Sequence, residues 1–302
     1  MTHHDYDEWR PIRRGATRRR LMEASLVLTA VDVTHVVIRD EHDWCIKVPS
    51  AEAPSAIAHL EKYRLENQPP PPAPAPDQVD NGLIGVLGFL VVIWAIPFFE
   101  NSGFLGWDWR VLGRLEAGAV MDGEWWRTIT ALTLHGDLGH IIGNSAFGAV
   151  FGLFAGRYIG SGLAWLLILL GGALGNLVAA ALRPAEFLSL GASTATFAAL
   201  SLSSAFVWRR GYFRGRGWRR AFAPVFAAIA LLSFTGVGGE RTDVLAHFTG
   251  FAAGLGLGVW AADWPIRRLG RIGQKLCGFA ALGLVLLAWA LAGSAGVAVT
   301  HP

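Results

Sequence analysis

Residues 161–182 read SGLAWLLILLGGALGNLVAAAL, a run without one charged side chain. A helix needs about 20 apolar residues to cross the hydrocarbon core of a bilayer. Lipid offers no partners for free backbone groups, so such a run persists in a membrane only with its backbone hydrogen bonds satisfied internally. The run ends at Arg183 and Pro184, and proline stops a helix. We therefore expect a membrane-spanning helix here.

Similar apolar runs lie on both sides of this one. We predict seven spans, at 81–99, 138–156, 161–182, 187–208, 221–239, 244–262 and 276–298. The chain is 53% hydrophobic and only 16% charged, which is more apolar than a soluble domain requires. Its net charge of +3 is too small to suggest a nucleic-acid partner. The expected fold is an all-α polytopic membrane protein, a seven-span helical bundle whose surroundings are the lipid bilayer.

The N-terminal part has a different character. Helical patterns at 17–29 and 51–67 enclose β-rich runs at 31–38 and 44–48, which predicts a small α+β domain over residues 1–66. A Pro-rich linker follows at 67–81, and it contains the spacer QPPPPAPAPDQ. The remaining predicted parts are a six-helix core at 82–262 and a seventh helix with its tail at 263–302.

Arginine placement predicts the orientation of the spans. Cytoplasmic loops carry an excess of Lys and Arg. With the N-terminus inside, the predicted inside loops are the basic segments 157–160, 209–220 and 264–275. The predicted outside loops hold scattered charges of both signs, at 100–137, 183–186 and 240–243. Since no secretory signal opens the chain, we expect a multi-pass protein of the inner (cytoplasmic) membrane with a cytoplasmic N-terminus.

A few polar side chains lie inside the predicted spans. His140 and Asn144 stand four residues apart in the second span, Ser193 lies in the fourth, and His247 begins a glycine-lined face of the sixth. These three spans all run from outside to inside, and each polar residue lies within about 9 Å of the outer end. Polar groups in spans are costly and are functional candidates. The sequence therefore predicts one polar level near the outer face.

These residue types fit acyl-transfer chemistry. A serine hydroxyl is a weak nucleophile until a neighbouring base takes its proton, and a neutral imidazole suits that role. The oxyanion that forms on attack needs donors such as His140 and Asn144. We expect Ser193 as nucleophile and His247 as base, with no cofactor and no metal, because no HExxH pattern accompanies the histidines. Taken singly, each residue also has a structural reading: a serine bonded to its own helix, or an interfacial histidine.

The same residues carry a resemblance to the rhomboid proteases. GEWWR at 123–127 resembles the WR element of the family's first outer loop, and HGDLGHIIGN at 135–144 is similar to its HxxxN helix start. Gly191-Ala192-Ser193 matches the first three positions of GxSG, and AHFTG at 246–250, running on to Gly254, matches AHxxGxxxG. The resemblance covers about 82–262, and the seventh span matches the bacterial six-plus-one arrangement.

The resemblance implies a role for each matching residue. Ser193 and His247 would form a catalytic dyad with no third acid, while His140, Asn144 and the Ser193 backbone N–H would bind the oxyanion. Trp126, Arg127 and His135 would be structural residues. The substrate would be the transmembrane helix of another protein, cut near the outer membrane face.

One position departs from the family pattern, since Thr194 stands where the family has glycine. A β-branched residue there could crowd the approach of Ser193 to His247. This motivates an alternative: a rhomboid-like protein that binds transmembrane helices and cuts them weakly or not at all. A transporter is a third class, but it would show broken helices or charged groups at mid-span.

Overall fold

The computed structural model describes residues 8–40, 43–68, 78–212, 230 and 243–300. Contacts divide the chain into two units, Met1–Pro72 and Ala73–Pro302. Most of the predicted linker 67–81 lies outside the described residues. The predicted span 221–239 also lies outside them, with most of its flanking loops 209–220 and 240–243.

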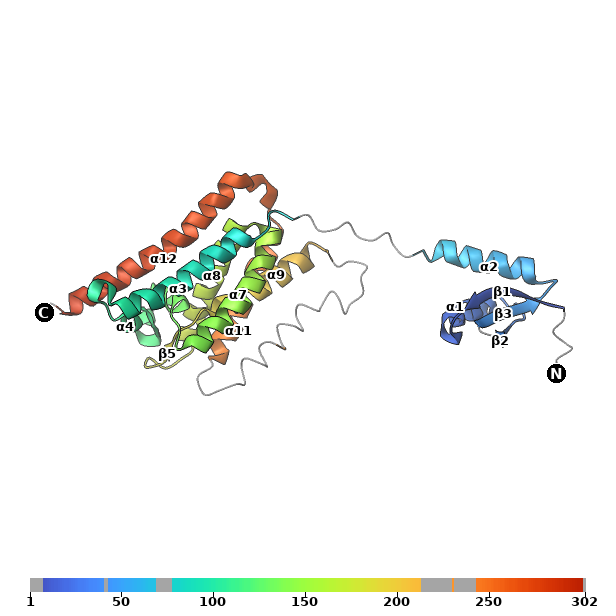
Figure 1. The fold of residues 1–302 in the computed structure, drawn as a ribbon, viewed down its shortest axis with the longest axis horizontal. Helices are drawn as coiled ribbons and strands as arrows, with labels where there is room; N and C mark the ends of the chain where they lie inside the picture. Colours follow the sequence, from blue (N-terminus) through green and yellow to red (C-terminus); the bar gives the residue numbers. More distant parts are fainter. Residues whose placement is uncertain (1–7, 41–42, 69–77, 213–229, 231–242, 301–302) are drawn as a thin grey trace. The chain divides into compact units, whose positions relative to one another are not determined.

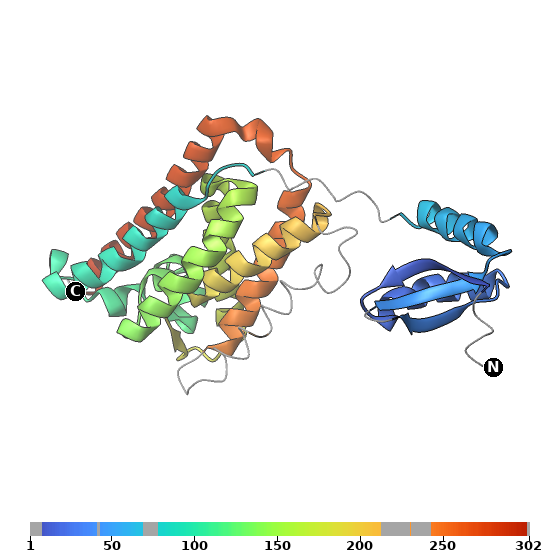
Figure 2. The same ribbon diagram turned by 45° about the vertical axis from the view of Figure 1, so that its right-hand side comes forward.

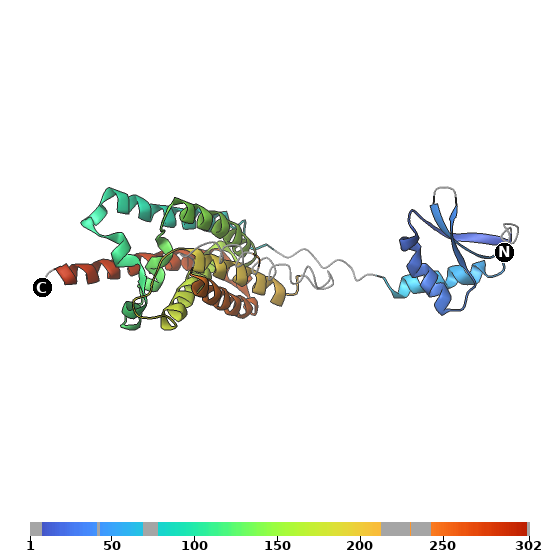
Figure 3. The same cartoon turned by 90° about the horizontal axis from the view of Figure 1, so that it is seen from below.

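The first unit is a small α+β domain. Its antiparallel sheet has the order β1-β3-β2, from β1 (Trp9–Gly15), β3 (Asp43–Pro49) and β2 (Val36–Asp40). Helices α1 (Arg18–Ala30) and α2 (Ala53–Glu66) pack on the face that carries Ile46 and Val48 (Figure 3). The predicted α+β fold is confirmed.

Strand β1 was not predicted by the sequence. Its residues WRPIRRG contain three arginines and a proline, and a register shift between Pro11 and Arg13 interrupts its pairing with β3. An edge strand tolerates such residues, because its outer backbone groups face solvent. The alternation that marks a strand is therefore absent.

The second unit is a bundle of long apolar helices (Figure 1). The long helices are α3 (Leu83–Ser102), α7 (Leu138–Ile159), α8 (Ser161–Ala181), α9 (Ser193–Arg209), α11 (Val244–Ala262) and α12 (Gly270–Thr300). Among the described residues, five helical segments are long and apolar enough to cross a membrane: Leu83–Ser102, Leu138–Ile159, Ser161–Ala181, Val244–Ala262 and Ile266–Ala295. The count of seven spans stays a prediction.

The predicted span 187–208 was wrong at its beginning. Its helix, α9, starts only at Ser193 and has 17 residues, about 25 Å of rise, which is shorter than the hydrocarbon core. The preceding residues form β5 (Leu188–Ser189), which pairs with β4 (Leu115–Glu116). Hydropathy could not reveal this, because the segment is apolar but takes its backbone partners from another loop.

Helix α8 is the centre of the bundle and contacts α7, α9, α11 and α12. The closest packing is between α9 and α11, where Gly250, Gly254 and Gly258 of α11 lie directly against backbone carbonyl groups of α9. Small residues at these positions let two helix backbones approach closely. This approach brings the first turn of α11 against the first turn of α9.

Helix α12 runs in the same direction as α3 along one side of the bundle (Figures 1 and 2). At its start, the Gln274 amide accepts from the Leu163 backbone N–H at 2.9 Å and donates to the Ile159 carbonyl at 3.0 Å. Further along, the Trp289 indole donates to the Thr133 hydroxyl at 3.1 Å. The first turns of α12 and a position in its second half are thus hydrogen-bonded to the rest of the bundle.

The segment between α3 and α7 folds as a chain of short elements. They are η2 (Phe104–Gly106), α4 (Trp109–Gly113), β4, α5 (Ala117–Met121), α6 (Arg127–Thr130) and η3 (Ala131–Thr133). Arg127 holds this segment together: its guanidinium donates to the carbonyls of Val111 at 3.0 Å and Arg114 at 2.9 Å and pairs with Glu124. The segment lies at the end of the bundle where α7, α9 and α11 begin.

Candidate active site

Ser193 and His247 meet where α9 and α11 begin. The Ser193 Oγ lies 2.7 Å from the His247 Nε2, within hydrogen-bond distance, although the residues are 54 positions apart. The Phe197 ring, one turn further along α9, stacks on the imidazole with centroids 4.6 Å apart. His247 is buried. The imidazole therefore contacts both the hydroxyl and an aromatic ring, while its Nδ1 has no hydrogen-bond partner among the described residues.

The turn before α9 presents Ser193 at the very start of the helix. Gly191 has a φ of +134°, in the region that favours glycine, and its N–H donates to the Ala131 carbonyl at 2.9 Å. A β-carbon at Gly191 would lie 2.6 Å from the His140 ring. Glycine is required here both for the backbone conformation and for the space that His140 occupies.

His140 and Asn144 lie on one face of the first turns of α7. Asp137 caps this helix, because its carboxylate accepts from the His140 backbone N–H at 2.9 Å. The Asn144 Nδ2 is buried and has no hydrogen-bond partner among the described residues. Buried polar groups normally find a partner, so this amide is a donor available to a bound group.

All four residues line one cavity. It has a volume of about 860 Å³, and its wall mixes apolar and polar side chains, including those of His140, Asn144, Ser193 and His247. The cavity is within the size range of ligand sites. The structure therefore brings together every site residue that the sequence singled out.

Asp243 is a wall residue that sequence reasoning missed. Its Oδ1 accepts from the Ala246 backbone N–H at 3.1 Å, which caps α11, and pairs with the Arg183 guanidinium at 3.1 Å. The signal was available, since an Asp immediately before an apolar helix is a common N-cap. Asp243 fixes where α11 starts and therefore where His247 stands, one turn later.

Thr194 does not separate the serine from the imidazole. It is buried, and its methyl group points toward Gly175 and Gly250, where added β-carbons would lie 2.9 and 2.7 Å from it. The side chain thus packs between α8 and α11. The crowding that the sequence suggested at this position is absent from the Ser193–His247 contact.

His135 lies just before α7, next to the site residue His140. Its ring packs edge-on against the His140 ring, with centroids 5.2 Å apart. Burial lowers the pKa of His135 to about 3, so the ring is neutral at physiological pH. Its carbonyl accepts from the Arg110 guanidinium at 3.2 Å. Among the described residues, no group of three His, Cys, Asp or Glu side chains could hold a metal ion.

Two comparisons relate this chain to known proteins. Residues 122–263 match the sequence model of the Rhomboid domain. A protein of Bacillus subtilis (strain 168) named "Putative rhomboid protease YdcA" is 27% identical over 169 residues, which cover 56% of this chain and 82% of the relative. The matched domain contains all four candidate site residues, from His140 to His247.

Proposed function

Because this chain is a rhomboid family protein, a multi-pass membrane protein of a family of intramembrane proteases, we propose that it is a serine endopeptidase with a Ser193–His247 dyad. The observation that carries the proposal is the 2.7 Å contact between the Ser193 Oγ and the His247 Nε2, made by two different helices in the wall of one cavity.

The proposed reaction proceeds through an acyl-enzyme. His247 takes the hydroxyl proton as the Ser193 Oγ attacks the substrate carbonyl, and a tetrahedral oxyanion forms. The C–N bond then breaks, and the amine leaves with the proton from His247. Water next attacks the ester, again with His247 as base, and releases the acid and the free serine. No cofactor takes part.

The oxyanion would be bound by His140, Asn144 and the Ser193 backbone N–H. The unpartnered Nδ2 of Asn144 supports this role. Ser193 is the first residue of α9, and the first amides of a helix have no partner inside it. Donors of this kind contribute about 2.7–4 kcal/mol each to the transition state.

We further propose that the substrate is a transmembrane helix of another protein. The arginine-rich inside loops favour an inner-membrane protein with a cytoplasmic N-terminus, which puts the cavity near the outer face. A helix must unwind before its carbonyl can be attacked, so cleavage is expected beside small or helix-breaking residues.

The test is cleavage of a single-span substrate by the full chain in proteoliposomes. The wild type should cut, and Ser193→Ala should not. A fluorophosphonate probe gives a second readout, since only an activated serine reacts. Full cleavage by Ser193→Ala would overturn the dyad. Helix binding without cleavage or labelling of the wild type would instead support the non-cutting alternative.

A further inference from the structure

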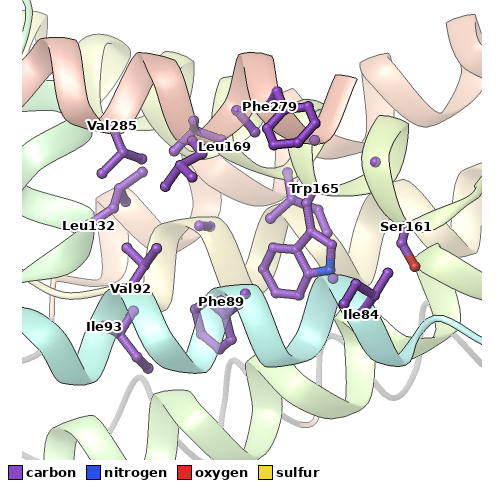
Figure 4. A pocket seen from close by; sticks show the side chains of 18 of the residues that line it. Ile84, Phe89, Val92, Ile93, Leu132, Ser161, Trp165, Leu169, Phe279 and Val285 are labelled. Carbon is purple, nitrogen blue, oxygen red and sulfur yellow. The ribbon is translucent and has the colours of Figure 1, made fainter. Parts of the chain in front are cut away.

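A second cavity is lined by a different set of residues from the active-site cavity. It has a volume of about 400 Å³ and runs between α3, α8 and α12. Its wall is almost entirely apolar. Figure 4 shows Phe89 of α3 and Trp165 of α8 beside one another in this groove, and their rings stack at 4.7 Å. The groove is long enough to reach from Ile84 to Ile93 of α3, about 14 Å of helix rise.

One end of the groove is polar and carries a cation. Lys275 lines this end, and Arg271 stands one helical turn before it on α12. Both are exposed, and neither forms an ion pair with a described residue. The Asp80 carboxylate also lies at this end. It already accepts a hydrogen bond from the Ser161 backbone N–H, at the start of α8, at 2.7 Å. The two cations are available to an anionic group.

At the other end, the lining of the groove on α3 stops at Ile93, about halfway along this helix. Trp109 lies between α3 and α12, with its ring 5.5 Å from Phe99 and 4.8 Å from Trp289. Val285 and Leu132 also line this end (Figure 4). A spanning helix would have to continue past this point, and the Trp109 cluster occupies that path. The groove therefore suits a molecule that extends through one leaflet only.

We propose that this groove binds an anionic phospholipid. The phosphate lies at Lys275 and Arg271, and one acyl chain lies along Phe89 and Trp165. Basic pockets at the ends of membrane helices select anionic headgroups, and the apolar slot accepts the chain. Under the orientation proposed above, the lipid comes from the inner leaflet.

The proposal gives the lipid a place behind the active site. Ala192 and Ala195 line the closed half of the groove, and they flank Ser193 in sequence. A bound chain fills the space behind the turn that presents this serine. A lipid that binds the folded chain and not the unfolded chain also raises the thermal unfolding midpoint of the protein.

The experiment is native mass spectrometry of the full chain in detergent, titrated with phosphatidylglycerol or with phosphatidylcholine of the same acyl chains. One phosphatidylglycerol should be retained in preference to phosphatidylcholine, and it should raise the unfolding midpoint. Equal retention of both lipids would overturn the proposal. So would a co-purified peptide that occupies the groove in place of lipid.

Two variants test the two ends of the groove separately. Lys275→Gln should lower phosphatidylglycerol affinity about fivefold. Arg268→Gln should not, because this neighbouring charge neither lines the groove nor belongs to α12, the helix that carries Arg271 and Lys275. Gly88→Leu should remove binding of both lipids, because its side chain enters the groove from a position with free space. Gly283→Leu is the matched control, since Gly283 also has free space but lies outside the wall.

Each of the two variants has an outcome that would refute one part of the proposed binding mode. If Lys275→Gln binds as the wild type does, the headgroup position is wrong. If Gly88→Leu folds and still retains lipid, the chain position is wrong. Lys275 is exposed and its replacement is compatible with folding, so the charge test stands even if Gly88→Leu is unstable.

Discussion

Gly250→Ala should separate Ser193 from His247 without touching either residue. Gly250 lies three residues after His247 on α11 and packs directly on Thr194 of α9. A β-carbon at Gly250 would lie 2.7 Å from the Thr194 Cγ2, and the Thr194 carbonyl oxygen would be nearer still. Thr194 is buried, so it has no room to turn away. The two helices must therefore move apart.

The size of the movement follows from these contacts. Ordinary contact begins at 3.4 Å, so relief of the Cγ2 contact requires the helices to separate by about 0.7 Å, and relief of the nearer carbonyl contact requires about 1.0 Å. If the whole first turn of α11 follows, the 2.7 Å between the Ser193 Oγ and the His247 Nε2 becomes about 3.4 Å or more, beyond the usual range of a hydrogen bond. Misplacement of about 1 Å lowers activity on the order of 10²-fold.

Gly256→Ala is the matched control on the same helix. Gly256 is exposed, and a β-carbon there meets nothing within 4 Å. Both substitutions raise helix propensity by the same amount, about 1 kcal/mol, so their difference isolates the packing between α9 and α11. Cleavage in proteoliposomes and the rate of fluorophosphonate labelling are the two readouts.

We expect cleavage and labelling to fall together in Gly250→Ala and to stay at the wild-type level in Gly256→Ala. Thermal unfolding shows whether both variants are folded. A folded Gly250→Ala that cleaves within about threefold of Gly256→Ala would refute the reasoning, because the close approach of the two helices would then not control the Ser193–His247 distance.

Three further outcomes are expected. Asn144→Ala should lower kcat about 10²- to 10³-fold at unchanged KM in the cleavage assay; unchanged turnover would remove Asn144 from the oxyanion site. Arg127→Ala should lower stability by about 2 kcal/mol, seen as a lower unfolding midpoint, because two carbonyls lose a charged donor; an unchanged midpoint would contradict this. Burial raises the pKa of the Cys45 thiol, so iodoacetamide should alkylate it slowly at pH 7 until the unit unfolds, whereas equal rates with and without denaturant would argue against a buried thiol.

Much of the bundle could be predicted because the bilayer imposes a simple rule. Uncharged runs long enough to span must be helical, and α8 is found almost where its run of apolar residues lies. A glycine face such as the one after His247 is typical of close helix contacts, and α11 packs on α9 through it. In both cases, one physical constraint determines both the sequence pattern and the structure.

Other features depend on contacts between distant segments and leave little local signal. The late start of α9 depends on the pairing of Leu188 and Ser189 with Leu115 and Glu116. The role of Asp243 depends partly on Arg183, 60 residues earlier in the chain. Composition along the chain indicates which segments are buried. It cannot show which two distant segments supply each other with hydrogen-bond or ion-pair partners.

The hydrogen bonds of Gln274 and Trp289 bear on how the protein is made. Both side chains belong to α12, which follows the other described helices in the chain, yet they complete polar groups near residues 133, 159 and 163, which are synthesised much earlier. During synthesis, the polar groups of these earlier residues lack their final hydrogen-bond partners until α12 is inserted. Final assembly of the bundle is therefore deferred until residue 289 has been synthesised and inserted, and a nascent chain that stalls before this residue is exposed to quality-control proteases.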